Sequence, residues 1–167
     1  MADYVIRPYS AADSVSDITT LLHAAYGSLA RQGLRFLASH QDDAMTLSRL
    51  TTGDTFIAES ADQIIGTISI YPPWPNSPCE WYRRARVFRL GQLAVAPERQ
   101  GEGIGRSLMY HAEQHARIRG ATSLALDTAE GAEQLIAWYL RLGFVQVGTV
   151  QWDVTNYRSV VFAKQLV

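Results

Sequence analysis

The most informative stretch of the chain is Gly91-Gln-Leu-Ala-Val-Ala-Pro-Glu-Arg-Gln-Gly-Glu-Gly-Ile-Gly-Arg106. Its apolar run before Pro97 has the character of a strand, which proline then ends because it has no N–H for a β-ladder. Three glycines within five residues follow, and apolar residues recur at helical spacing from Ile104 onward. The stretch therefore predicts a strand, a glycine-rich turn and the start of a helix.

A glycine-rich turn before a helix is typical of an anion site. The N-terminus of a helix carries unsatisfied N–H groups and a partial positive charge, and glycine lets the backbone approach a ligand closely. Phosphate or pyrophosphate is therefore the expected ligand. A P-loop is excluded because Arg106 and Ser107 follow Gly105. The spacing of Gly101, Gly103 and Gly105 also differs from the dinucleotide fingerprint. An ordinary turn at a helix start is the alternative.

Composition places the chain among ordinary globular proteins. Its 167 residues are 47% apolar and 19% charged, with a net charge of −1, so we expect one domain over residues 1–167 and no nucleic-acid partner. We find no apolar run long enough for a bilayer and no signal-peptide pattern, so we expect a cytoplasmic protein without a membrane partner. The single cysteine, Cys79, excludes an intrachain disulfide and a cysteine-rich metal site, and no metal is expected.

The pattern along the chain predicts seven strands and four helices. The expected strands are residues 4–6, 55–60, 63–71, 87–96, 123–128, 144–152 and 157–162. Helices are expected after the capping box at residues 14–17 and over 42–53, 104–119 and 135–142. Four prolines make residues 71–86 a loop. The order β-α-α-β-β-β-α-β-α-β-β predicts an α/β fold, in which a mixed central sheet of about seven strands has helices on both faces.

Two motifs carry a resemblance to a known family. Gln100-x-x-Gly103-x-Gly105 resembles the pyrophosphate loop of the GCN5-related N-acetyltransferases (GNAT), and Tyr139-Leu-Arg-Leu-Gly-Phe144 resembles that family's Tyr-x-x-x-Gly-Phe. The predicted element order is also that of the family. The resemblance implies an acyltransferase that moves an acetyl group from acetyl-CoA to a primary amine of a small molecule, peptide or protein, by direct attack on the thioester. A non-catalytic acyl-CoA-binding or regulatory module on the same fold is the alternative, and a homodimer is left open.

The resemblance also implies which residues bind acetyl-CoA. Amides of the glycine loop would meet the pyrophosphate, the strand backbone would bond the pantetheine arm, and the amide of Leu93 would face the thioester oxygen. The residues so implied are Leu93, Ala94, Val95, Gln100, Gly101, Glu102, Gly103, Ile104, Gly105, Arg106 and Ser107. The chain departs from the family at Ala132, where many members have an asparagine that contacts the pantetheine.

Two residues are the candidates for proton transfer. Helical periodicity alone would make Tyr139 a core aromatic. It matches, however, the family tyrosine that commonly points at the CoA sulfur, and a phenol with a pKa of ~10 is a protonated donor at neutral pH. Asp127 matches a glutamate that serves as base in ribosomal-protein N-acetyltransferases. Asp127 could instead cap the next helix or bond a turn amide, and Glu80 is a weaker candidate base.

The resemblance also implies that acceptor choice depends on three loops, at residues 30–40, 71–86 and 152–157, because the family's acceptor enters between segments at these positions. The aromatic residues of the middle loop would either line an acceptor pocket or pack the loop onto the sheet; they are Tyr71, Trp74, Trp81 and Tyr82. A basic cluster follows, comprising Arg83, Arg84, Arg86 and Arg89. It is expected to be a solvated surface, with the CoA 3′-phosphate or an acidic acceptor as alternative partners.

Overall fold

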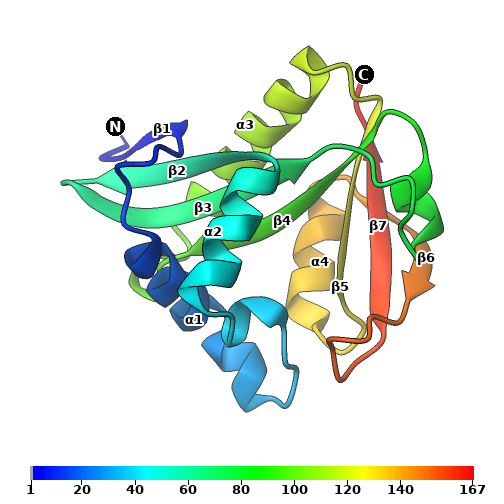
Figure 1. Cartoon of the computed structure of the whole chain (residues 1–167), viewed down its shortest axis with the longest axis horizontal. Helices are drawn as coiled ribbons and strands as arrows, with labels where there is room; N and C mark the ends of the chain where they lie inside the picture. Colours follow the sequence, from blue (N-terminus) through cyan, green and yellow to red (C-terminus); the bar gives the residue numbers. More distant parts are fainter. Residues whose placement is uncertain (1) are drawn as a thin grey trace.

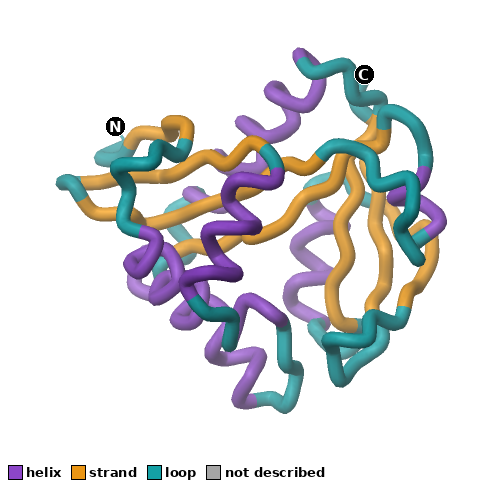
Figure 2. Tube along the Cα trace, viewed as in Figure 1, coloured by secondary structure: helices purple, strands orange, loops and turns teal. Residues whose placement is uncertain are grey.

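The computed structural model describes residues 2–167 and places seven strands in one sheet, in the order β1-β2-β3-β4-β5-β7-β6 (Figure 1; Figure 2). Every neighbouring pair is antiparallel except the parallel pair β4–β5. The strands are β1 (Val5–Pro8), β2 (Asp54–Ser60), β3 (Gln63–Tyr71), β4 (Val87–Val95), β5 (Ser123–Ala129), β6 (Val145–Val150) and β7 (Ser159–Gln165). The predicted mixed α/β sheet is confirmed.

Helices cover both faces of this sheet, also as predicted. The helices α1 (Val15–Arg31) and α2 (Asp43–Thr52) pack on one face, and α3 (Ile104–Ile118) lies behind β3 and β4 in Figure 1. The short α4 (Glu133–Arg141) joins β5 to β6. Its buried Tyr139 packs against Phe162 of β7. Among residues 2–167, no helix has both the length and the apolar character needed to cross a bilayer.

Local sequence signals position most element ends. Ser14 and Asp42 cap α1 and α2, each accepting a hydrogen bond from the amide three residues later. Ala61 and Asp62 form the predicted tight hairpin, both with positive φ. The last strand runs from residue 159 to 165 rather than from 157 to 162, because Ser123 at the start of β5 pairs with Gln165. The apolar pattern of the terminal residues does not report that register.

The sheet splits between β4 and β5. The two strands pair only from Val87 with Ser123 to Arg89 with Ala125, and Figure 1 shows them diverging beyond this point. A β-bulge interrupts β4 just after the split, where Gln92 has a φ of 51°. From residue 90 to residue 95, β4 therefore keeps β3 as its neighbour and has an open edge toward β5.

Candidate active site

The open edge of β4 offers hydrogen-bond donors to the cleft. The N–H group of Ala96 donates a hydrogen bond to the carbonyl of Ile65 in β3, at 2.8 Å. Because backbone groups of successive residues point to opposite edges of a strand, Leu93 and Val95 turn theirs toward the cleft. Tyr26 donates to the carbonyl of Leu93 at 2.8 Å, and Gln100 donates to that of Val95 at 3.2 Å. The N–H groups of Leu93 and Val95 remain, and they suit carbonyl oxygens of a bound acyl thioester and its amide arm.

The glycine loop fits an anion through its main chain. Gly101 and Gly103 both have a φ of 86°, and a Cβ added at either would meet nothing within 4 Å. Gly103 is also the N-cap of α3 and supplies no side-chain hydrogen bond to the first turn. The start of α3 therefore has open space beside both glycines and no side-chain cap, so its first-turn amides are available to an anion such as pyrophosphate.

Several side chains that were expected to bind acetyl-CoA instead make contacts within the protein, in or near the glycine loop. Gln100 bonds the end of β4, and the Glu102 carboxylate pairs with Arg99 at 2.8 Å. Ile104 is a core residue, 1% exposed. The hydroxyl of Ser107 accepts a hydrogen bond from Tyr4 at 2.8 Å. At these positions, as at the glycines, the main chain is what could contact acetyl-CoA. Ala94 differs, because its backbone turns to β3 rather than to the cleft. Arg106 lies exposed on the first turn of α3.

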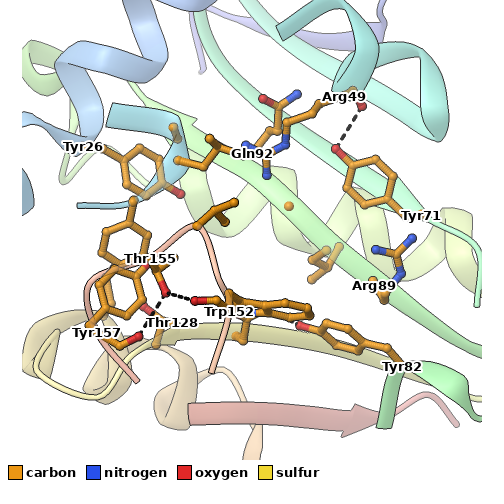
Figure 3. Close-up of a pocket in the computed structure, with 18 of the residues that line it drawn as sticks. Tyr26, Arg49, Tyr71, Tyr82, Arg89, Gln92, Thr128, Trp152, Thr155 and Tyr157 are labelled. Carbon is orange, nitrogen blue, oxygen red and sulfur yellow. Dashed lines mark hydrogen bonds between the residues drawn. The ribbon is translucent and has the colours of Figure 1, made fainter. Parts of the chain in front are cut away.

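A cavity of about 440 Å³ lies where β4 and β5 separate (Figure 3). All three loops that were expected to affect acceptor choice contribute to its wall. Eight aromatic residues line it: Tyr26, Phe36, Tyr71, Trp74, Tyr82, Tyr139, Trp152 and Tyr157. The Trp74 ring is stacked on Trp152 with an interplanar angle of 4°. Trp81 is not part of the wall and lies under the Arg84 guanidinium instead.

Tyr139 presents a protonated phenol to this cavity. Its side chain is 6% exposed, and within residues 2–167 its hydroxyl has no protein hydrogen-bond partner. Burial raises the pKa of Tyr139 above its ordinary value, with smaller contributions from Tyr26 and Asp127. The phenol therefore keeps its proton at neutral pH, as a general acid must.

Asp127 lies in β5 and is held by two aromatic side chains from different loops. Its Oδ1 accepts a hydrogen bond from the Tyr82 hydroxyl at 2.5 Å, and its Oδ2 accepts one from the Trp152 indole at 2.8 Å. It does not cap α4, whose N-cap is Ala132. Glu80 is exposed, pairs with Arg84 and lies outside the cavity. Asp127 is thus the one carboxylate among the residues that line the cavity.

The predicted basic cluster does not form one surface. Arg83 donates to the carbonyl of Ser77, Arg84 pairs with Glu80, and Arg86 donates to the carbonyl of Gly120. Only Arg89 reaches the cavity. The wall also contains Tyr26, Arg49 and Gln92, which sequence reasoning did not assign to the site.

Comparison with known proteins agrees with this geometry. Residues 18–144 match the profile of the Acetyltransferase (GNAT) family. The S-(2-succino)cysteine N-acetyltransferase of Bacillus subtilis (strain 168) is 29% identical over 144 residues, which is 84% of this chain and 83% of that protein. N-acetyltransferase 8F1 of Rattus norvegicus is 28% identical over 112 residues, which is 65% of this chain. The aligned region is 48% of the rat protein, so the chain spans about half of that relative.

The fold comparison extends over the whole chain. A GNAT family acetyltransferase from Elizabethkingia anophelis, solved with acetyl-CoA bound, superposes with a TM-score of 0.69. The match covers 99% of this chain and 100% of that one, at 17% sequence identity. With the family profile covering most of its length, the chain belongs to the acetyltransferase (GNAT) family.

Proposed function

We propose that this protein is an acetyl-CoA-dependent N-acetyltransferase that acts on a primary amine. One observation carries the proposal: the open edge of β4 leads from the glycine loop to a cavity whose wall contains both Tyr139 and Asp127. An acyl-donor cleft and an acceptor pocket therefore meet at two groups that can transfer protons.

The donor side would be held by main-chain groups. Amides from Gly101 to Arg106 bind the pyrophosphate at the start of α3, and the N–H groups of Leu93 and Val95 bind oxygens along the pantetheine arm. When bound, acetyl-CoA supplies a thioester carbon open to attack. The amide of Leu93 would lie nearest that group and would stabilise charge as it develops on the thioester oxygen.

The acceptor amine must lose a proton, and the leaving sulfur must gain one. A new bond forms between the amine nitrogen and the carbonyl carbon, while the bond from that carbon to sulfur breaks. Asp127 receives the amine proton, directly or through water, and Tyr139 donates its proton to the sulfur. The burial that raises the pKa of Tyr139 would also raise that of a thiol in the same cleft, so the proton transfer between them remains feasible.

The relatives leave the acceptor open. The Bacillus subtilis relative is named for S-(2-succino)cysteine, and a Streptomyces lavendulae relative, 36% identical over 95 residues, is named for streptothricin. Both names describe an acetyl transfer, which the first specifies as transfer to nitrogen, and they differ in the molecule that accepts the group. An amine of a small molecule, peptide or protein is the common class.

An amine panel tests the function. The purified chain is incubated with acetyl-CoA and single amines, and CoA release is followed together with the mass of each product. We expect release only with some amines, each gaining one acetyl group. Binding of acetyl-CoA without CoA release across the panel would contradict the enzyme assignment and favour the acyl-CoA-binding module.

A further inference from the structure

Positive charge dominates the polar part of the cavity wall. Arg49 of α2 and Arg89 of β4 both line it; Figure 3 shows Arg49 across the cavity from Trp152, and Arg89 between Tyr71 and Tyr82. Neither guanidinium has an ion-pair partner among residues 2–167. The one lining carboxylate, Asp127, already accepts two hydrogen bonds. Both guanidiniums are half-buried, and the cost of withdrawing a charge from water is offset best by an opposite charge, which neither of them has in the described part of the chain.

A chain of hydrogen bonds adds a third donor. Arg49 Nη1 donates to Gln41 Oε1 at 2.7 Å, and Gln41 Nε2 donates to Gln92 Oε1 at 2.9 Å. Arginine can only donate, so the amide orientation of Gln41 is fixed, and that of Gln92 follows from it. Gln92 is 3% exposed, and its Nε2 has no partner. Since a buried unpaired donor is unfavourable, this N–H group points to a ligand that accepts.

The two arginines meet at the same aromatic ring. The Cζ of Arg89 is 5.1 Å from the centroid of the Tyr71 ring. A Cβ added at Gly91 would lie 2.9 Å from Tyr71 and 3.7 Å from Arg49 Nη2, so the Arg49 guanidinium reaches β4 beside that ring. Glycine at position 91 therefore lets Tyr71 and Arg49 pack closely against β4. Both arginines therefore lie beside Tyr71 on the β4 side of the wall, and Gln92, which Gln41 connects to Arg49, lines the same cavity.

A purely structural role accounts for only part of this arrangement. Arg89 Nε bonds the carbonyl of Pro72 at 3.2 Å, and the Trp74 ring also lies near the guanidinium. These contacts hold the proline-rich loop. They use neither the remaining N–H groups of Arg89 nor the free amide of Gln92. Burial lowers the pKa of Arg89, which a bound anion would oppose.

We propose that the acceptor is a primary amine that also carries a carboxylate, which Arg49, Arg89 and Gln92 bind at the β4 side of the cavity. The aromatic wall takes an apolar or aromatic side chain, as in an aromatic amino acid. The proposal rests on the N-acetyltransferase function and narrows its substrate class. A polycationic acceptor is disfavoured, because two arginines face the cavity against a single carboxylate.

The test compares L-phenylalanine with L-phenylalaninamide as acceptors, in the wild type and in Arg49→Met and Gln92→Glu. The second substitution keeps the oxygen that accepts from Gln41 and replaces the free donor with an acceptor. Since the two amines differ in basicity, the informative quantity is the change in their kcat/KM ratio between variants. We expect each substitution to lower the preference for the carboxylate roughly 10- to 100-fold, the loss of one charge-assisted interaction. The matched control, Arg84→Met, removes an arginine outside the cavity and keeps the wild-type ratio.

A binding measurement separates this proposal from the function on which it rests. Calorimetry with CoA-saturated protein compares 3-phenylpropionate with 3-phenylpropanamide, neither of which can be acetylated. We expect tighter binding of the carboxylate, lost in Gln92→Glu. This result would support the anion site even if no amine were acetylated. Equal binding of both compounds, or a wild-type kcat/KM ratio in both variants, would overturn the proposal while leaving acetyl transfer to other amines intact.

Discussion

Tyr26 of α1 donates its hydroxyl proton to the main-chain carbonyl of Leu93, 2.8 Å away. The bond ties a helix on one face of the sheet to β4 directly after its bulge. It also engages the carbonyl of Leu93, one of the two that face the cleft. The N–H groups of Leu93 and Val95 are not used by this bond and remain available to a ligand. Burial raises the pKa of Tyr26 to about 12, so the donor stays protonated across the working pH range.

Replacing Tyr26 with Phe should loosen this part of β4. The ring can keep its packing on Phe36, whose centroid is 5.2 Å away, while the carbonyl of Leu93 loses its partner. We expect the free energy of unfolding to fall by about 1 kcal/mol and kcat to fall severalfold. Urea denaturation and steady-state kinetics measure the two effects. Tyr110→Phe, at a side chain 64% exposed, is the control. An equal loss of stability and kcat in that variant would show that the effect does not come from the hydrogen bond to Leu93.

Replacing Gly103 with Val should weaken acetyl-CoA binding at least tenfold, measured by calorimetry. The added side chain would occupy the open space over the loop, and a β-branched residue is strained at a φ of 86°. Gly120→Val is the matched control, because Gly120 has a φ of 85° and equally open surroundings at the other end of α3. It should show similar destabilisation with unchanged affinity. Equal loss of affinity in both variants would place the effect in the fold rather than in the loop.

Replacing Asp127 with Asn should separate its chemical role from its structural one. The indole of Trp152 can only donate, so the Asn oxygen would turn to it, and the amide N–H would donate to the Tyr82 oxygen. Both contacts can therefore survive, and we expect at most about 2 kcal/mol of lost stability. As a lost base, the change should lower kcat by roughly 10²-fold or more. Trp152→Phe removes one contact but keeps the carboxylate. If Asp127→Asn retains the wild-type kcat, Asp127 is only a structural link between the two loops.

Much of the fold was predictable from local signals. The caps at Ser14 and Asp42, the Ala61-Asp62 turn and the apolar periodicities depend on nearby residues, and so they can be read from sequence. The glycine loop and Tyr139 were recognised through motifs of fixed spacing. The register of β7 was not, since it depends on pairing with a strand far away in the sequence.

The acceptor side of the site was mostly beyond sequence reasoning. Arg49 and Tyr26 lie on helices where they fit an ordinary amphipathic pattern, and only tertiary packing turns them toward the cavity. Gln92 lines the cavity at a β-bulge, and no residue type near it in the sequence predicts that bulge. The four arginines before β4 and at its start are close together in sequence, but the backbone of the loop and strand directs their side chains to different partners.

The most direct measurement of the central claim is kcat and acetyl-CoA Kd for Tyr139→Phe beside the wild type. The substitution removes only a hydroxyl without a protein partner, so the packing against Phe144 and Phe162 should persist. We predict a kcat lowered by roughly 10²-fold with unchanged Kd and melting temperature. Because burial raises the pKa of Tyr139, the wild-type rate should show no loss from its ionisation up to about pH 10. A variant that keeps full kcat across that pH range would contradict the account and make Tyr139 a packing residue.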